Sequence, residues 1–233
     1  PSPRSMLAKV QAIVSPLLPE LHKGQAGRVG VLGGCREYTG APYYASMSSM
    51  RLGCDMSFTI CAPEAAQAIK GYSPDLIVHP ALDASKSMEE VREELKALFA
   101  RLHSVVIGPG PVSYTHLTLP TILEKGRTDR IATPRGVVEC DLEGGLKRCG
   151  GQGDLLSGTL GTFLAWAKRF EERKAQGEAL PDFDLDELPM LAAYGASCVT
   201  RTASRRGFAR LGRSMLANDL LSEIGPAYGD LFV

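Results

Sequence analysis

Residues 149–158 hold the side chains whose types and spacing best suit chemistry. Gly150, Gly151 and Gly153 lead directly to Asp154, after which an apolar, helix-like segment begins. Glycines let a ligand approach the backbone closely. The free N–H groups and positive dipole end of a helix starting here attract anions such as phosphate. A carboxylate would repel that phosphate, and makes sense there if it accepts a proton or orients a nucleophile. An ordinary helix cap at Asp154 explains the same residues equally well.

Composition and charge narrow the class of protein. The chain has 233 residues with 26 basic and 26 acidic side chains, and 44% of its residues are hydrophobic. This favours a single domain over residues 1–233 with a substantial core. It argues against nucleic acid or an anionic membrane as the main partner. No segment approaches the roughly 18 consecutive apolar residues that span a bilayer.

The cysteines indicate a reducing compartment. All six are scattered, without a CxxC pair or a histidine at zinc-ligand spacing, so we expect free thiols and no metal-binding residues. The predicted location is intracellular and cytoplasmic. A mitochondrial form stays open because the chain begins Pro1-Ser2-Pro3, without a methionine.

Short apolar runs alternate with helical patterns in the first half of the chain. Strands are expected at 28–32, 56–61, 75–80 and 104–107, and helices at 5–18, 42–52, 65–69 and 89–102. This alternation predicts an α/β fold with a mostly parallel sheet. Ligands bind at the carboxyl ends of such strands, which makes Gly33-Gly34 and Gly108–Gly110 candidate site residues.

The second half of the chain has a different pattern. It predicts antiparallel strands within 122–131 and at 136–140, followed by helices at 154–173, 187–206 and 213–224. In the first of these helices, Gly158 and Gly161 would allow another helix to approach closely. Four arginines, Arg201, Arg205, Arg206 and Arg210, either attract phosphate or lie on solvated helix faces, and we favour the second interpretation.

Together these features describe a phosphate-handling site. There is no GxxxxGK[ST] sequence, so a P-loop is excluded. Backbone amides at Gly153 would instead hold a transferring phosphoryl group at the helix start. Asp154 would then deprotonate the attacking hydroxyl.

Five motifs in order resemble the ATP-dependent NAD(P)H-hydrate dehydratase family, and the residues between them are most similar to fungal members. The motifs are Lys23–Gly34, Tyr38–Tyr44, Gly108-Pro109-Gly110, Lys125–Asp129 and Arg148–Gly158. The resemblance implies a three-layer ribokinase-like fold, with a mostly parallel central sheet flanked by helices. It also implies nicotinamide nucleotide repair, in which ATP with Mg²⁺ phosphorylates the hydroxyl of NADHX or NADPHX and phosphate then leaves.

The resemblance also implies roles for individual residues. Asp154 matches the catalytic, substrate-contacting acid, and Gly110 matches a contact to the hydrated nicotinamide nucleotide. The matches to ATP-binding residues are Lys125, Gly126, Arg127, Thr128, Asp129, Gly145, Leu146, Lys147, Arg148, Cys149, Gly150, Gly151, Gln152 and Gly153. The partners would be NAD(P)HX and ATP, and a homo-oligomer is left open.

One part of the family pattern is missing. After Gly108–Gly110, members continue with a helix and strands ending in Asp-Ala-Asp-Gly and Asn-x-x-Glu type motifs, which this chain lacks. At about 30 residues per βαβ unit, roughly 60–90 residues are absent. Residues 112–121 lie at the junction and fit neither a helix nor a strand pattern. We therefore expect the shortened chain to fold poorly or to lack activity.

Two alternatives remain. A ribokinase-like kinase acting on a vitamin precursor or a sugar would use the same Gly-Asp helix start, but would leave a stable phosphoester. A nucleotide-binding remnant without turnover would bind ATP and release no phosphate. Tyr38–Pro42 and Gly150–Gln152 favour the dehydratase.

Overall fold

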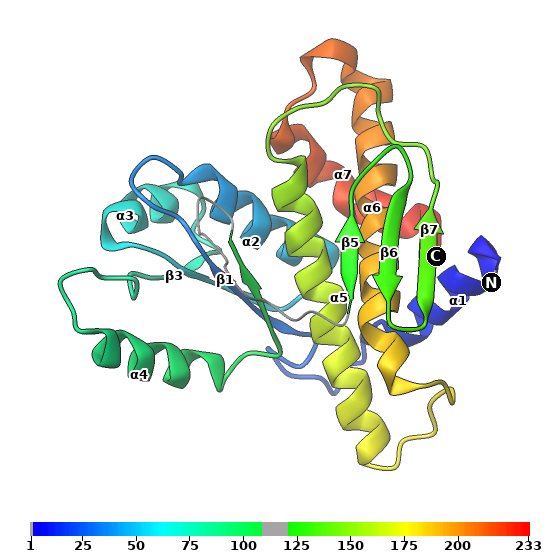
Figure 1. The fold of residues 1–233 in the computed structure, drawn as a ribbon, viewed down its shortest axis with the longest axis horizontal. Coiled ribbons are helices and arrows are strands. Elements are labelled where there is room, and N and C mark those ends of the chain that lie inside the picture. Colours follow the sequence, from blue (N-terminus) through cyan, green and yellow to red (C-terminus); the bar gives the residue numbers. More distant parts are fainter. Residues whose placement is uncertain (1, 109–120) are drawn as a thin grey trace.

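A parallel α/β unit forms the first half of the molecule (Figure 1). The computed structural model describes residues 2–108 and 121–233. In chain order this unit contains β1 (Arg28–Leu32), α2 (Gly40–Leu52), β2 (Met56–Ile60), α3 (Pro63–Tyr72), β3 (Ile77–His79), α4 (Met88–Phe99) and β4 (Ser104–Ile107). The four strands form one sheet in the order β3-β2-β1-β4, and every neighbouring pair is parallel. The predicted parallel sheet is therefore confirmed.

Helices dominate the second half. They are α5 (Gln152–Ala175), α6 (Leu188–Leu211) and α7 (Ala217–Phe232), joined on the same side by the N-terminal α1 (Pro3–Ile13). Short 3₁₀ turns at Leu185–Glu187 and Gly212–Ser214 precede and follow α6. Buried side chains of α1, α5, α6 and α7 share one hydrophobic core, which includes Phe163, Phe170 and Leu191.

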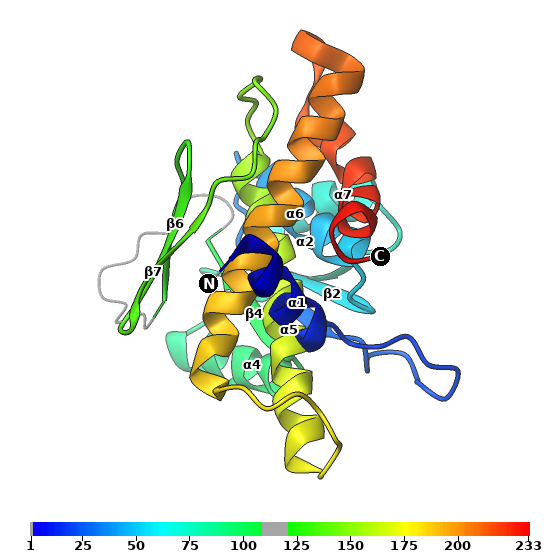
Figure 2. The same ribbon diagram turned by 90° about the vertical axis from the view of Figure 1, so that its right-hand side faces the viewer.

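A second, antiparallel sheet lies beside α6 (Figures 1 and 2). Its strands, β5 (Ile122–Glu124), β6 (Asp129–Thr133) and β7 (Gly136–Cys140), pair in chain order. Asp129 at the start of β6 pairs in register with Cys140 at the end of β7. The sheet therefore directs the loops before β6 and after β7 towards the same end of α6.

Two glycines of α5 let that helix sit close to its neighbours. A β-carbon on Gly158 would lie 1.9 Å from the carbonyl oxygen of Ala45 in α2, so only glycine fits at this crossing. A β-carbon on Gly161 would lie 2.8 Å from Val106 and 2.9 Å from Val29. Gly158 thus serves the predicted helix contact, whereas Gly161 faces the sheet. Gly158 therefore sets the distance of α5 from α2, and Gly161 sets its distance from β1 and β4.

Several predicted boundaries were wrong by a few residues. The first helix ends at Ile13 rather than at residue 18, and α5 begins at Gln152, two residues before Asp154. The last helix runs from Ala217 to Phe232 instead of over 213–224. Gly110 and residues 112–120 of the anomalous stretch lie outside the described residues.

The β4 edge of the parallel sheet and the helix before it are poorly buried. Among the described residues, β4 has β1 as its only strand neighbour, and Ile107 is 50% exposed. No residue of α4 is buried, although its sequence is amphipathic. No helix in residues 2–108 or 121–233 has the length and apolar character needed to cross a membrane.

Candidate functional site

Helix α5 begins with a backbone turn that only glycine accommodates well. Gly151 is the N-cap, with φ of 90° and ψ of −13°. A β-carbon there would lie 2.7 Å from the β-carbon of Ala217. The carbonyl oxygen of Gly151 accepts hydrogen bonds from the amides of Asp154 and Leu155, both at 3.0 Å. Asp154 is therefore the third residue of the helix and not its cap, which corrects that interpretation of the sequence.

The carboxylate of Asp154 accepts no hydrogen bond from the described residues. Burial raises its pKa above the ordinary value, while the positive charge of Lys125 acts in the opposite direction. The Lys125 Nζ lies 3.0 Å from the position of a β-carbon on Gly153. An ammonium group, the first amides of a helix and a carboxylate with raised proton affinity thus share one small region. This arrangement suits an anion and a hydroxyl held side by side.

Tyr44 of α2 contacts the same turn and was not predicted as a site residue. Its ring lies 3.4 Å from the position of a β-carbon on Gly151. Burial raises its pKa most, and the charge of Asp154 is among the smaller contributors. Tyr43 packs edge-on against it, with ring centroids 5.2 Å apart. The structure therefore brings the start of α2 to the start of α5, and the only sequence signal for this was the Tyr38–Tyr44 motif.

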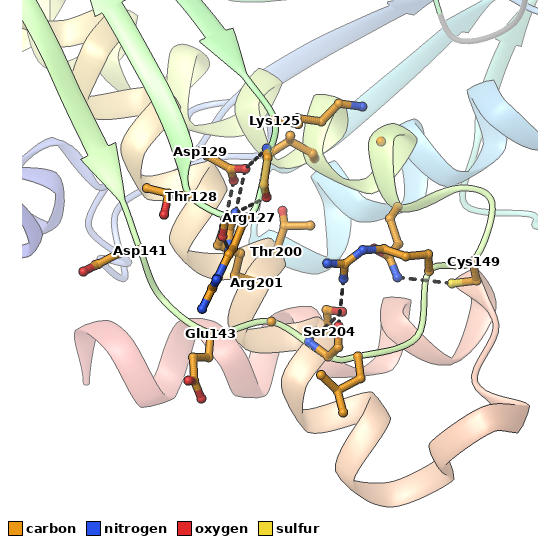
Figure 3. A pocket seen from close by; sticks show the side chains of 18 residues that line it. Lys125, Arg127, Thr128, Asp129, Asp141, Glu143, Cys149, Thr200, Arg201 and Ser204 are labelled. Atoms are coloured by element: carbon orange, nitrogen blue, oxygen red, sulfur yellow. Dashed lines mark hydrogen bonds and ion pairs between the residues drawn. The ribbon is translucent and has the colours of Figure 1, made fainter.

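A cavity of about 1020 Å³ opens beside this turn (Figure 3). One wall is the 125–129 loop, the second is the 141–149 loop with the start of α5, and α6 forms the floor. Eleven predicted ATP-binding residues line it: Lys125, Gly126, Arg127, Thr128, Asp129, Gly145, Leu146, Arg148, Cys149, Gln152 and Gly153. Two segments predicted separately thus form one pocket, whose volume is typical of a small-molecule site.

Four further predicted residues are close in sequence to the lining residues but do not line the cavity, and Gly110 lies outside the described residues. Lys147, Gly150, Gly151 and Asp154 are outside the lining. The Lys147 ammonium donates instead to the carbonyl oxygen of Arg213. Sequence reasoning missed the lining residues of α6, which are Thr200, Arg201 and Ser204, together with Asp141, Glu143, Gly144 and Leu156.

Comparison with known proteins assigns the family. The family model described as NAD(P)H-hydrate dehydratase matches residues 29–113 and 115–226. The chain belongs to this family. It is 41% identical to the ATP-dependent (S)-NAD(P)H-hydrate dehydratase of Mycosarcoma maydis, over 98% of this chain and 89% of that protein. It is 36% identical to the protein of the same name from Schizosaccharomyces pombe, over 99% of this chain and 94% of that protein.

Solved structures agree on the ribokinase-like fold. A ribokinase-like superfamily protein from Enterococcus faecalis superposes with a TM-score of 0.69 at 15% identity, over 100% of this chain and 95% of that one. An ADP/ATP-dependent NAD(P)H-hydrate dehydratase from Bacillus subtilis, co-crystallised with ATP and Mg²⁺, gives 0.65 at 16% identity, over 97% of both chains. At these identities the likeness concerns the fold alone.

The family match also locates the missing segment. The alignment to the Mycosarcoma maydis dehydratase runs over 314 residues, whereas this chain has 233. The family model breaks between residues 113 and 115, inside the stretch that fits no secondary-structure pattern. In the fold, this break follows β4, the strand with one neighbour among the described residues. The dehydratase family therefore carries residues after β4 that have no counterpart here.

The cavity has few fixed ligands for a metal ion among the described residues. The described residues contain no group of three or more His, Cys, Asp or Glu side chains placed to hold one. Mg²⁺ that arrives with a nucleotide is usually held by phosphate oxygens and one or two carboxylates. Asp141 and Glu143 are the exposed carboxylates on the pocket wall. The site thus fits a nucleotide-borne Mg²⁺ better than a resident ion.

Proposed function

We propose that the cavity between the 125–129 and 141–149 loops binds ATP, and that Asp154 is the base for ATP-dependent dehydration of NADHX or NADPHX. The observation that carries this proposal is the position of Asp154. Its carboxylate accepts no hydrogen bond from residues 2–108 or 121–233 and lies within the first turn of α5, whose Gln152 and Gly153 line the cavity. A phosphoryl group held at this helix start would lie next to a substrate hydroxyl on Asp154.

The proposed reaction has two steps. Asp154 accepts the proton of the substrate hydroxyl while the oxygen forms a bond to the γ-phosphorus, and ADP leaves with the bridging oxygen. The C–O bond of the phosphorylated hydrate then breaks and phosphate departs with the bonding electrons. The neighbouring ring carbon loses a proton to water, and its C–H electrons form the C=C bond that restores NADH or NADPH. Lys125 and the first amides of α5 would stabilise charge on the transferring group. Mg²⁺ would neutralise charge on the ATP phosphates.

A second candidate is ATP binding without turnover. The open edge of β4 and the lack of buried residues in α4 favour it, because the family's additional residues after β4 have no counterpart here. The nucleotide pocket would be retained, whereas part of the wall that holds the substrate against Asp154 would be missing.

Two measurements on the purified chain separate the candidates. Calorimetric titration with Mg·ATP tests binding, and recovery of NADH absorbance from NADHX with ATP tests dehydration. Binding with NADH recovery and phosphate release supports the dehydratase, whereas binding alone supports the second candidate. A stable phosphoester would point to a kinase. No detectable Mg·ATP binding by a cooperatively folded chain would contradict both proposals.

A further inference from the structure

Arg201 and Asp129 form a largely buried ion pair in the lining of the nucleotide pocket (Figure 3). The Arg201 Nε donates to Asp129 Oδ2 at 2.8 Å, and its Nη2 donates to Asp129 Oδ1 at 2.7 Å. The two side chains are only 13% and 8% exposed. This two-point contact holds the guanidinium plane in one orientation. The prediction of a solvated helix face is therefore wrong for Arg201.

The remaining hydrogen-bond donors of Arg201 go to backbone carbonyls of both pocket walls. Nη2 donates to Gly126 O at 2.8 Å, and Nη1 donates to Arg127 O at 3.0 Å and to Leu142 O at 2.9 Å. A guanidinium has five N–H donors. With the two bonds to Asp129, all five are used within the protein. Arg201 thus has no donor left for a phosphate, although it lines the pocket.

Asp129 extends this contact network. Its Oδ1 also accepts the amide of Gly126 at 2.9 Å, which closes the 125–129 loop. Its Oδ2 accepts the hydroxyl of Ser197, one turn before Arg201 on α6, at 2.6 Å. Both carboxylate oxygens therefore bond to the protein, and the loop is tied to two successive turns of the helix.

The next turn of α6 holds the other wall. The amide of Gly145 donates to the hydroxyl of Ser204 at 3.2 Å. A β-carbon on Gly145 would lie 2.4 Å from the Ser204 carbonyl oxygen, so the 141–149 loop sits directly on the helix. One face of α6 therefore sets the positions of both loops that form the cavity.

We infer that Arg201 is a positioning residue that holds the two walls of the nucleotide pocket at a fixed separation, and that it does not itself bind the nucleotide phosphates. The inference rests on the proposed ATP site, whose walls these are. Arg201 is suited to the task because its planar fork reaches three carbonyls and one carboxylate at once. Lysine has three donors on a single nitrogen and cannot reproduce that geometry.

The test compares Arg201→Met and Arg201→Lys with Arg206→Met. Arg206 lies on the same helix and is ion-paired with Glu223 and Asp230, but it does not line the cavity. Two readouts are needed: the Kd of Mg·ATP by calorimetry, and hydrogen exchange of the backbone amides in 125–129 and 141–146. Both readouts are measured under conditions in which circular dichroism shows each variant to be folded.

We expect Arg201→Met to raise the Kd on the order of tenfold and to speed exchange in both loops together. Arg201→Lys should restore the charge but neither the Kd nor the slow exchange. Arg206→Met should leave the Kd and the exchange of both loops unchanged. If Arg201→Met does not fold, Arg201→Lys replaces it, and exchange in both loops of that variant should still be faster than in the native chain.

Three results would overturn the inference. If Arg201→Met leaves hydrogen exchange in both loops unchanged, a positioning role is excluded. A Kd restored by Arg201→Lys, with the loops still mobile, would instead indicate that the charge acts on the nucleotide. If Arg201→Met does not fold, slow exchange in both loops of Arg201→Lys counts against the inference equally. If the native chain binds no Mg·ATP, the proposed function fails, while loop exchange in Arg201→Met still decides the positioning role.

Discussion

The ammonium of Lys125 lies 3.0 Å from the position that a β-carbon on Gly153 would take. The two residues come from different parts of the fold, since Lys125 follows β5 and Gly153 is in the first turn of α5. Their contact places a cation beside the helix start and close enough to Asp154 to oppose the rise in its pKa that burial causes. The same cation thus acts on both groups that the proposed reaction needs, the anion site and the base.

Replacing Lys125 with Met should raise the pKa of Asp154 further. Burial already raises it, and Lys125 is the group that opposes the increase. A base works when deprotonated, so the acid limb of the pH profile for NADH recovery should move to higher pH. The ¹³C shift of the Asp154 carboxyl, titrated by NMR, measures the same change without turnover. Lys168→Met on the outer part of α5 is the control. An unmoved carboxyl titration would contradict the prediction.

Gly151→Ala should destabilise the start of α5, whereas Gly150→Ala should not. Gly151 has φ of 90° and lacks space for a β-carbon. Gly150 has no positive φ, and a β-carbon added to it would meet no atom of the described residues within 4 Å. We expect Gly151→Ala to lower the free energy of unfolding by about 1–3 kcal/mol and to weaken Mg·ATP binding. Urea denaturation and calorimetry measure the two effects. Equal stability of the two variants would show that the turn relaxes easily.

The local features of this fold could be predicted from sequence, because they depend on neighbouring residues. Apolar runs such as Arg28–Leu32 and the glycines around Gly151 carry their signal within a few positions. The contact between Arg201 and Asp129 leaves no such local signal, because 72 residues separate the two. A weak signal did exist: Arg201 is a charged residue in a run of buried small residues on α6, and such a charge requires a partner.

Replacing Asp129 with Asn should reduce stability at neutral pH and have less effect in acid. Burial alone would raise the pKa of Asp129, but hydrogen bonds from Arg201, Ser197 and Gly126 outweigh it and lower the pKa. A carboxylate with a lowered pKa stabilises the fold above its unfolded-state value of about 3.9. That contribution is lost as the pH falls through the folded-state pKa.

We expect Asp129→Asn to lower the free energy of unfolding by about 3 kcal/mol at pH 7. The difference from the native chain should shrink below about pH 4. Urea denaturation between pH 3 and 7 measures it. Asp182→Asn is the matched control, because the Asp182 side chain is also ion-paired, to Lys174, but is 95% exposed. A loss of stability that does not vary with pH would exclude the buried carboxylate as its cause.

Mild oxidation should join Cys140 to Cys198. Their sulfurs are 3.5 Å apart in the core. The hydrogen bond between the two thiols lowers the pKa of Cys140 to about 7. Diamide would take up the two hydrogens as the sulfurs close to about 2.05 Å. Peptide mapping should then find this disulfide, and either Cys140→Ser or Cys198→Ser should abolish it, whereas Cys61→Ser should not. Retention of all six thiols under diamide would contradict the prediction.

The sheet edge at β4 and the helix α4 should exchange their amide hydrogens faster than α5 and α6. Among the described residues, α4 has no buried side chain and β4 has a strand neighbour on one side, whereas α5 and α6 contribute many buried residues to the core. Local opening exposes few apolar contacts in the first case and many in the second. The family's additional residues follow β4 in sequence, so this is the region their loss should weaken most.

Hydrogen exchange followed by mass spectrometry resolves these elements in the native chain. We expect rapid exchange in Met88–Phe99 and Ser104–Ile107, and slow exchange in Gln152–Ala175 and Leu188–Leu211. The nucleotide pocket is built mainly on the slowly exchanging part, so Mg·ATP should protect 125–129 and 141–149 without protecting α4. Equal protection of α4 and α6 would mean that the shortened sheet is as stable as the helical core. In that case the open edge would not explain a loss of dehydratase activity.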